Sequence, residues 1–355
     1  MNLLAMLGLA HPIIQAPMAG VSTPEMAAAV SNAGALGSIS VGAVDTSAAR
    51  TMIEAVRART DRPFNVNLFV HAPARARPAL EQRWIDALAP LFGEYGAQPP
   101  PSLREIYRSF AEDDAMLAML INARPAVVSF HFGLPDRWRI DRLKAAGCLL
   151  LASVTNLDEA LAAKAAGIDA VVAQGFEAGG HRGMFDPDGP DDSLGTIALT
   201  RLLVERAGLP VIAAGGIMDG RGVQAAIDLG AVAAQLGTAF IACPESSADT
   251  AYRAALFSPA AAHPVMTRVV SGRPARCLPN RFTAWGQQSD RQPPDYPIAY
   301  DAGKALNQAA KAAGEGGYGA QWAGQCAPLA RELPAADLVE LLVAEMREAC
   351  HAGLP

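Results

Sequence analysis

The chain has 355 residues, of which 51% are hydrophobic and 18% are charged, and its formal net charge is −6. This length accommodates one α/β barrel of about 250 residues plus an appendage. Because the charge is negative and the basic residues are dispersed, we expect neither a nucleic-acid partner nor an anionic membrane surface.

The five cysteines are an odd number, lie far apart in the sequence and include no Cys-x-x-Cys pair. This pattern argues against a disulfide framework and against a zinc site, and it favours a reducing, cytoplasmic location. The apolar N-terminus lacks the basic region of a signal peptide and runs directly into a predicted strand, so we interpret it as the start of the fold. No apolar run has the length needed to span a membrane.

In chain order, the sequence repeats one pattern in which an alanine-rich helix ends at a glycine and a short apolar strand follows directly. Such C-capping glycines and short connections are typical of parallel α/β units. Four helices of this kind are predicted, at residues 24–33, 140–146, 156–166 and 222–229. Eight strands are predicted, at residues 11–16, 36–41, 64–68, 126–131, 149–153, 170–174, 210–214 and 231–236. This α/β alternation predicts a closed TIM (β/α)8 barrel, and the lack of GxGxxG after the first strand disfavours a Rossmann domain.

Two segments interrupt the alternation. Residues 71–114 are too long and too rich in proline for a βα loop, and we expect a helical flap over the third strand. Residues 243–310 lack α/β periodicity, so a smaller, mainly helical cap on the substrate side is predicted. The barrel then comprises residues 1–70 and 115–242. Residues 311–355 are predicted to form a glycine-rich linker and a C-terminal helix that packs back on the barrel.

Two glycine turns carry the clearest ligand signal. The seventh strand ends at Gly215 and Gly216, and the eighth leads into Gln235, Gly237 and Thr238. In a barrel, the loops after these two strands are the usual phosphate site, and a missing Cβ lets a ligand approach the backbone closely. The competing interpretation is that such glycines serve only the packing of a βαβ unit.

The other strand ends are rich in amides and poor in carboxylates. They offer no acid pair for glycoside hydrolysis, no lysine for a Schiff base and no cluster with metal-ligand spacing, so we expect no metal. Side-chain amides such as Asn67 and Gln174 can donate and accept at the edge of a ring. With a phosphate cradle they suit a flat heterocycle with a phosphate tail, such as FMN, although sugar-phosphate and nucleotide sites use similar groups.

Six segments together resemble the nitronate monooxygenase family, formerly called 2-nitropropane dioxygenases, and its bacterial class I members in particular. They are IIQAPMAGVSTPEMAAAVSNAGALGSI, NVNLF, VVSFHFGLP, VVAQGFEAGGHRG, VIAAGGIMDGRG and AAQLGTAF. The resemblance spans nearly the whole chain in matching order. It implies an FMN-containing barrel that oxidises alkyl nitronates, with propionate 3-nitronate as the expected substrate, using O2. The products would be a carbonyl compound and nitrite or nitrate, in a detoxification role.

Matched motif by motif, the resemblance also implies roles for single residues. His131 corresponds to the family's active-site histidine, acting either as a base or as an anion-positioning group. Tyr296, Tyr300 and Lys304 correspond to a substrate cluster, and Tyr300 and Lys304 would share a helix face. The implied FMN contacts are Met18, Asn67, Gln174, Gly179, Gly216, Gln235, Leu236, Gly237 and Thr238.

The sequence also allows other roles for several residues and another function for the chain. His131 could be a core histidine bonded to a carbonyl, and His181 could shape a turn near the phosphate or merely cap it. His71 is expected to be a solvated or lid residue, and the glycine-rich stretch 314–319 a flexible linker. The competing function is an NAD(P)H-dependent FMN reductase of quinones or enoyl thioesters, and a flavin-free aldolase or isomerase is a more distant one. A monomer and a homodimer are both compatible with the sequence.

Overall fold

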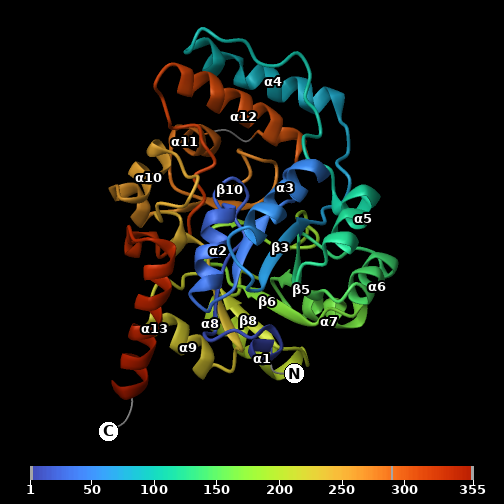
Figure 1. Cartoon of the computed structure of the whole chain (residues 1–355). Coiled ribbons are helices and arrows are strands. Elements are labelled where there is room, and N and C mark those ends of the chain that lie inside the picture. Colours follow the sequence, from blue (N-terminus) through green and yellow to red (C-terminus); the bar gives the residue numbers. More distant parts are fainter. Residues whose placement is uncertain (1–2, 289–290, 353–355) are drawn as a thin grey trace.

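The computed structural model describes residues 3–288 and 291–352 and has a central sheet of eight parallel strands enclosed by helices (Figure 1). The strand order is β1-β9-β8-β6-β5-β4-β3-β2, and a parallel bridge between Ile14 and Leu36 brings the two ends of the sheet together. The predicted TIM (β/α)8 barrel is confirmed, and each strand lies within two residues of its predicted range. The strands are β1 (Ile13–Gln15), β2 (Gly37–Ser40), β3 (Phe64–Phe69), β4 (Val127–His131), β5 (Leu149–Val154), β6 (Ala170–Gln174), β8 (Val211–Ala214) and β9 (Ala233–Leu236).

Helices cover the outside of the barrel, so the strands are buried on both faces, as a parallel sheet requires. Most of these helices begin at a polar residue whose side chain accepts a hydrogen bond from a backbone N–H of the first turn, which satisfies one otherwise unpaired donor. Asp45, Asp136, Asn156 and Asp219 act in this way. The surrounding helices are α2 (Pro24–Asn32), α3 (Thr46–Arg57), α5 (Asp114–Ala123), α6 (Arg137–Ala145), α7 (Leu157–Ala166), α8 (Thr196–Arg206) and α9 (Gly220–Asp228).

The amino-terminal end of the barrel is closed by the short helix α1 (Leu3–Leu7). Leu3 and Leu7 are buried and pack in one cluster with strand residues such as Leu149 and Ile212. Because this end is filled by apolar side chains, the opposite rim, where the strands end, is the side that is left for a ligand.

A cap of additional elements stands over that opposite rim. Helix α4 (Pro78–Gly93) lies alongside α12 (Ile298–Ala312) at the top of Figure 1, and the two share a cluster that contains Trp84, Leu88 and Leu306. Among the described residues, five further short helices lie between α4 and α12 in the sequence. They are η1 (Phe110–Glu112), η2 (Thr238–Phe240), α10 (Thr250–Leu256), η3 (Pro259–Ala262) and α11 (Arg281–Gln287).

A second, three-stranded sheet was not predicted. It has the order β10-β11-β7 and consists of β7 (Gly180–His181), β10 (Val265–Thr267) and β11 (Ala275–Cys277). Its antiparallel pairing joins the loop after β6 to the cap, with His181 opposite Ala275. This sheet therefore fixes the position of the loop that carries Gly179, a predicted FMN contact, and His181.

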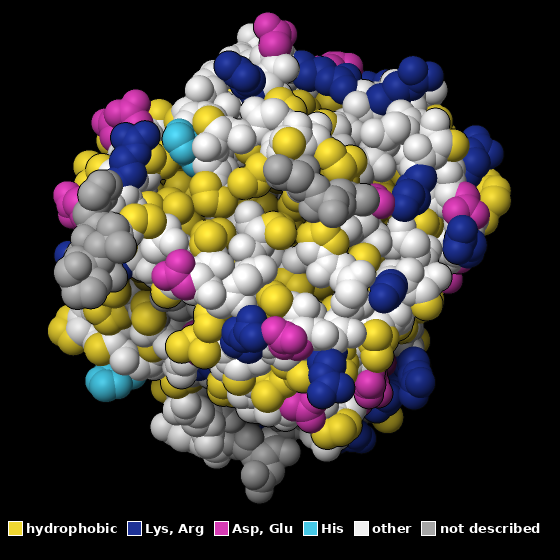
Figure 2. Space-filling view, turned by 90° about the horizontal axis from the view of Figure 1, so that it is seen from below, with side chains coloured by type: hydrophobic (Ala, Val, Ile, Leu, Met, Phe, Trp, Pro, Cys, Tyr) yellow, Lys and Arg dark blue, Asp and Glu magenta, His cyan; other side chains and the backbone are white. Residues whose placement is uncertain are grey.

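The chain ends with η4 (Ala327–Leu329) and helix α13 (Ala335–Ala352), which packs against α9 and α2. Ala335, Leu338, Val339 and Leu342 of this helix are fully buried. In the described part of the chain, no helix combines the length and the apolarity needed to cross a bilayer. On the face shown in Figure 2, acidic and basic side chains alternate around exposed hydrophobic ones.

The contact between β2 and α2 gives a test of the packing. A Cβ at Gly37 would overlap the carbonyl oxygen of Ala27, so Gly37→Ala should lower the free energy of unfolding by about 1–3 kcal/mol or more. Gly93→Ala is the matched control, because a Cβ there meets no atom within 4 Å. Urea denaturation of both variants measures the difference. Equal stability of the two would contradict this packing.

Candidate active site

A cavity of about 730 Å³ opens at the carboxyl ends of the barrel strands, beneath the cap. It brings together residues from the barrel, the loop after β6 and α12. The predicted residues that line it are Met18, Asn67, His131, Gln174, Gly179, Gly216, Gln235, Gly237, Thr238, Tyr296, Tyr300 and Lys304. Leu236 is placed differently. Its side chain packs in the core beside β9, and its carbonyl accepts a hydrogen bond from the Ala16 N–H at 2.8 Å.

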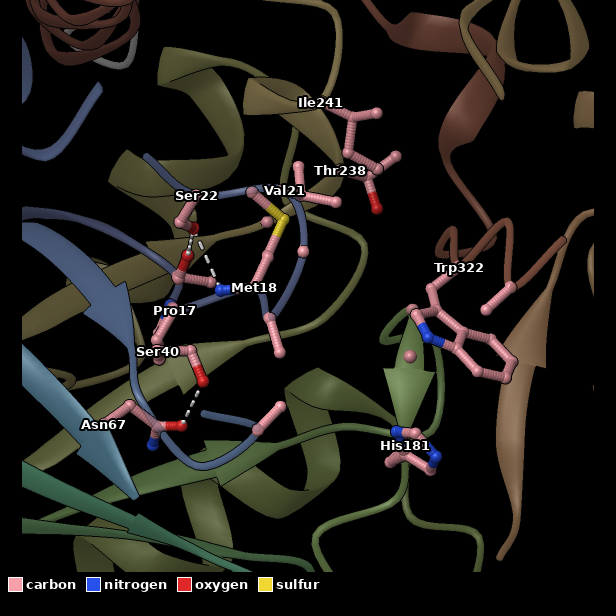
Figure 3. Close-up of a pocket in the computed structure, with 18 of the residues that line it drawn as sticks. Pro17, Met18, Val21, Ser22, Ser40, Asn67, His181, Thr238, Ile241 and Trp322 are labelled. Carbon is pink, nitrogen blue, oxygen red and sulfur yellow. Dashed lines mark hydrogen bonds between the residues drawn. The ribbon is translucent and has the colours of Figure 1, made fainter. Parts of the chain in front are cut away.

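The loop after β1 forms one wall of the cavity (Figure 3). Buried Gln15 fixes its path, since its amide donates to Ser22 Oγ at 2.8 Å and accepts from the Ser38 N–H at 2.8 Å. Ser22 Oγ in turn accepts from the Met18 N–H at 2.9 Å. These bonds hold Met18 against the cavity, opposite Trp322 and His181.

Asn67 lies on the floor of the cavity, with both ends of its amide bonded to neighbouring strands. Its Oδ1 accepts from Ser40 Oγ at 3.2 Å, and its Nδ2 donates to Ser129 Oγ at 3.0 Å (Figure 3 shows the first bond). Nδ2 also donates to the Ser129 carbonyl at 3.3 Å, so both of its N–H groups are directed at β4, whereas Oδ1 keeps a second lone pair for a ligand.

Gln174 and Arg182 organise the loop after β6. Arg182 is buried, and its Nε and Nη2 donate to the carboxylate of Asp191 at 2.8 and 2.9 Å. Its Nη1 donates to the Gln174 carbonyl at 2.9 Å. The Gln174 side chain accepts from the Gly183 N–H at 2.7 Å and donates to the His181 carbonyl at 2.9 Å. A paired, buried guanidinium that binds backbone carbonyls gives this loop a single conformation.

The two glycine turns and the start of η2 form a cradle at one end of the cavity. Gly216 has φ +70°, a conformation that glycine adopts without strain. Among the described residues, the backbone N–H groups of Gly179, Gly216 and Gly237 have no acceptor, so they are available to an anion. The Thr196 N–H at the N-terminus of α8 is not available to an anion, because it already donates to the carboxylate of Glu177 at 2.8 Å.

His131 and His181 stand at the inner end. The His181 carbonyl can only accept, so the bond from His131 Nε2 at 3.2 Å places a proton on that nitrogen and leaves Nδ1 as the acceptor. Burial, reinforced by the positive charge of Arg273, lowers the pKa of His131 to about 4. Burial, His131 and Arg273 also lower the pKa of His181 well below its ordinary value. Both imidazoles are therefore neutral at neutral pH.

An aromatic wall faces these histidines from the cap. Tyr296 and Tyr300 lie with ring centroids 5.4 and 6.3 Å from that of His181. Lys304, on the same face of α12 as Tyr300, has its Nζ 4.8 Å from the centroid of the Tyr107 ring and 5.4 Å from that of Tyr300. Burial lowers its pKa, and Asp301 partly opposes the shift. A partly desolvated cation thus lies at the mouth of the cavity.

Comparison with known proteins agrees with this arrangement. The sequence profile described as nitronate monooxygenase matches residues 1–345. The chain belongs to the nitronate monooxygenase family. Two relatives described as nitronate monooxygenases are from Paraburkholderia phytofirmans (61% identity, covering 98% of this chain and 95% of the relative) and Pseudomonas aeruginosa (57% identity, covering 96% and 98%).

The solved structures show the same relationship for the fold. A nitroalkane oxidase from Streptomyces ansochromogenes matches with a TM-score of 0.92 and 42% identity, covering 99% of both chains. FabK from Thermotoga maritima is more distant, with a TM-score of 0.75 and 29% identity over 98% of this chain and 96% of that one. The family is one of oxidoreductases, and this chain shares both its sequence pattern and its barrel.

Several cavity residues of this family member were not predicted. Tyr107 comes from the segment 71–114, and Trp322 and Gly324 follow the glycine-rich stretch, which lines the cavity through Gly316 and Gly319. Gly324 N–H donates to Thr238 Oγ1 at 3.0 Å, beside the cradle. Of the two alternatives for His71, the solvated one was wrong, because its side chain is buried against Tyr296 with a ring-centroid distance of 5.1 Å. None of these contacts has a local sequence signal, since each depends on tertiary packing.

The neutral state of His131 predicts how the free energy of unfolding depends on pH. A histidine with a pKa near 6.5 when unfolded and about 4 when folded binds protons more readily in the unfolded state, so stability falls as the pH drops from 6.5 towards 4. For His131 the loss should be on the order of 2 kcal/mol at about pH 4.5. Urea denaturation of the wild type and His131→Asn across this range measures it. The variant should lose stability less steeply, and identical slopes would contradict a neutral His131.

Proposed function

We propose that this protein binds FMN in the cavity and oxidises alkyl nitronates with O2, with propionate 3-nitronate as the expected substrate, and that it acts as a cytoplasmic detoxification enzyme. The observation that carries the proposal is the match to the nitronate monooxygenase family over residues 1–345, together with a cavity that gathers the expected residues. The family is flavin-dependent in general.

The chemistry of the cavity supports FMN as the cofactor. The free N–H groups of Gly179, Gly216 and Gly237 suit a terminal phosphate, and a positive-φ glycine at residue 216 allows close approach. Asn67 and Gln174 present amide groups at the ends of their strands, which suit the polar edge of a ring system. Met18 and Trp322, on opposite sides, are suited to apolar contact with a flat ligand. These residues would hold the phosphate, the polar edge and the ring.

When bound, FMN would supply the redox chemistry, and the protein's residues would hold the substrate. A nitronate is an anion and needs charge compensation, which Lys304 would provide as a charge-assisted donor. His131 is neutral, with Nδ1 free to accept, so its proposed role is to accept a hydrogen bond or a proton rather than to add charge. The aromatic wall of Tyr296 and Tyr300 would exclude bulk water from the inner end.

The direct test is oxygen consumption by the purified protein with propionate 3-nitronate, accompanied by mass analysis of the flavin released by heat. The proposal expects FMN and rapid oxygen uptake that depends on the nitronate. Release of FAD would overturn the placement of the phosphate. A yellow protein that consumes no oxygen with any nitronate would overturn the activity.

Lys304 gives a more specific prediction. Lys304→Met keeps the apolar stem but removes the charge and the donors, so FMN content should be unchanged and KM for propionate 3-nitronate raised about 10–100-fold, which corresponds to about 1–3 kcal/mol. Steady-state oxygen-electrode kinetics on this substrate and on ethyl nitronate measure the effect. A larger loss for propionate 3-nitronate places Lys304 at the carboxylate, and equal losses place it at the nitro group.

Lys144→Met is the control, because Lys144 pairs with Asp169 on the outside of the barrel at 2.8 Å. Wild-type KM values for both substrates in Lys304→Met would remove Lys304 from the substrate site.

A further inference from the structure

Arg273 is a buried cation behind the inner wall of the cavity. Only 3% of it is exposed, and among the described residues no carboxylate lies within ion-pair distance of its guanidinium. One Nη donates to the Met184 carbonyl, whereas Nε has no hydrogen-bond partner there. Because moving an unpaired charge out of water costs free energy, we infer that this arginine has a role specific to its position.

The guanidinium lies against a strained turn of the active site. Its Cζ is 4.2 Å from the centroid of the Phe132 ring, a cation–π contact. Phe132 has φ +79°, which is unusual for a bulky residue and persists only where packing enforces it. The same ring lies 4.5 Å from His131 and 5.4 Å from His181, centroid to centroid. Arg273 therefore packs on the residue that orients both histidines.

A chain of hydrogen bonds joins the histidines to the backbone that carries this cation. His131 Nε2 donates to the His181 carbonyl, and His181 Nε2 lies 2.8 Å from Ser271 Oγ. His131 has its proton on Nε2, because its partner is a carbonyl, which only accepts. The Ser271 hydroxyl also lies 3.4 Å from the Arg273 carbonyl. In the arrangement that we infer, it donates to that carbonyl and accepts from His181 Nε2, so that both imidazoles have the proton on Nε2 and the lone pair on Nδ1.

We propose that Arg273 is a positioning residue, which holds His131 and His181 as uncharged imidazoles of one tautomer and supplies a fixed positive charge behind the cavity wall. The histidine part of this proposal stands independently. Its consequence for catalysis rests on the proposed oxidation of nitronates. A positive charge with no carboxylate in ion-pair contact among the described residues favours an anion at the inner end of the cavity, so it selects the nitronate over the neutral nitroalkane.

The groups around Arg273 agree with this role. Its charge contributes to lowering the pKa of His71, His131 and His181, each of which is lowered first by burial. Arg182 acts on His131 in the same direction. The other charged or titratable groups that act on Arg273 itself are Tyr296, Glu159, Arg268 and Asp188. The two acids, Glu159 and Asp188, raise the pKa of Arg273 and so favour its charged form, although neither forms an ion pair with it in the described part of the chain.

The first test reads the histidines directly and needs no turnover. NMR of the protein with ¹⁵N-labelled histidine, assigned with His131→Asn and His181→Asn, reports the charge and tautomer of each ring. In the wild type, both rings should stay neutral and Nε2-protonated from about pH 5 to 8. In Arg273→Met, at least one should titrate within this range or lose its single tautomer, and Arg273→Lys should restore the neutral state in part.

Arg139→Met is the control. Arg139 is also a buried arginine, 8% exposed, with its Cζ 5.6 Å from the centroid of the Trp138 ring, but it pairs with Asp114 and Asp136 on the outside of the barrel and does not act on the histidines. This variant should leave both histidine titrations unchanged. The proposal is overturned if either histidine titrates between about pH 5 and 8 in the wild type, a result that holds even where Arg273→Met fails to fold. It is also overturned if folded Arg273→Met titrates like the wild type.

The second test compares substrates in the FMN-loaded enzyme. For Arg273→Met, kcat/KM should fall at least about ten-fold more for ethyl nitronate than for neutral nitroethane, whereas Arg139→Met should change both equally. An equal loss for both substrates in Arg273→Met would overturn the anion-selecting role. If the wild type oxidises no nitronate, the proposed function fails, and the NMR titration still decides the role of Arg273 towards the histidines.

Discussion

The closure of a parallel sheet constrains everything else in this molecule. Because all strands of the barrel run in the same direction, their carboxyl ends meet at one rim, and residues from distant parts of the sequence are gathered there. The other end is filled by α1 and by apolar strand residues. The polar side chains of Asn67, His131 and Gln174 therefore face one cavity, although each belongs to a different strand.

Buried arginines hold the loops of this rim in place. Arg182 ties the loop after β6 to Asp191 and to the end of its own strand, and Arg276 donates to the Phe176 carbonyl from β11. Arg273 packs on Phe132. A guanidinium has five donors in a rigid plane, so a single buried side chain can bind several backbone carbonyls that have no regular partner. In this way the irregular loops acquire the rigidity that a binding site requires.

Much of this fold was predictable because its signals are local. Short apolar runs, four of them preceded by a C-capping glycine, predicted the eight strands to within two residues, and the two glycine turns that were expected to form a cradle, at Gly216 and Gly237, both line the cavity. The strands of the second sheet have only two or three residues, too few for a periodic pattern. The burial of His71, the arrival of Trp322 at the cavity and the position of Arg273 depend on contacts between segments far apart in the sequence, so they required the structure.

In the proposed function, the cavity holds a flavin that accepts electrons from a nitronate rather than from a nicotinamide. Anaerobic mixing of the purified yellow protein with propionate 3-nitronate, with NADH and with NADPH, while the flavin absorbance is followed, tests this most directly. The proposed function predicts bleaching by the nitronate and an unchanged spectrum with either nicotinamide. Rapid bleaching by NADH or NADPH, with no change on addition of the nitronate, would contradict it and favour a flavin reductase on the same barrel.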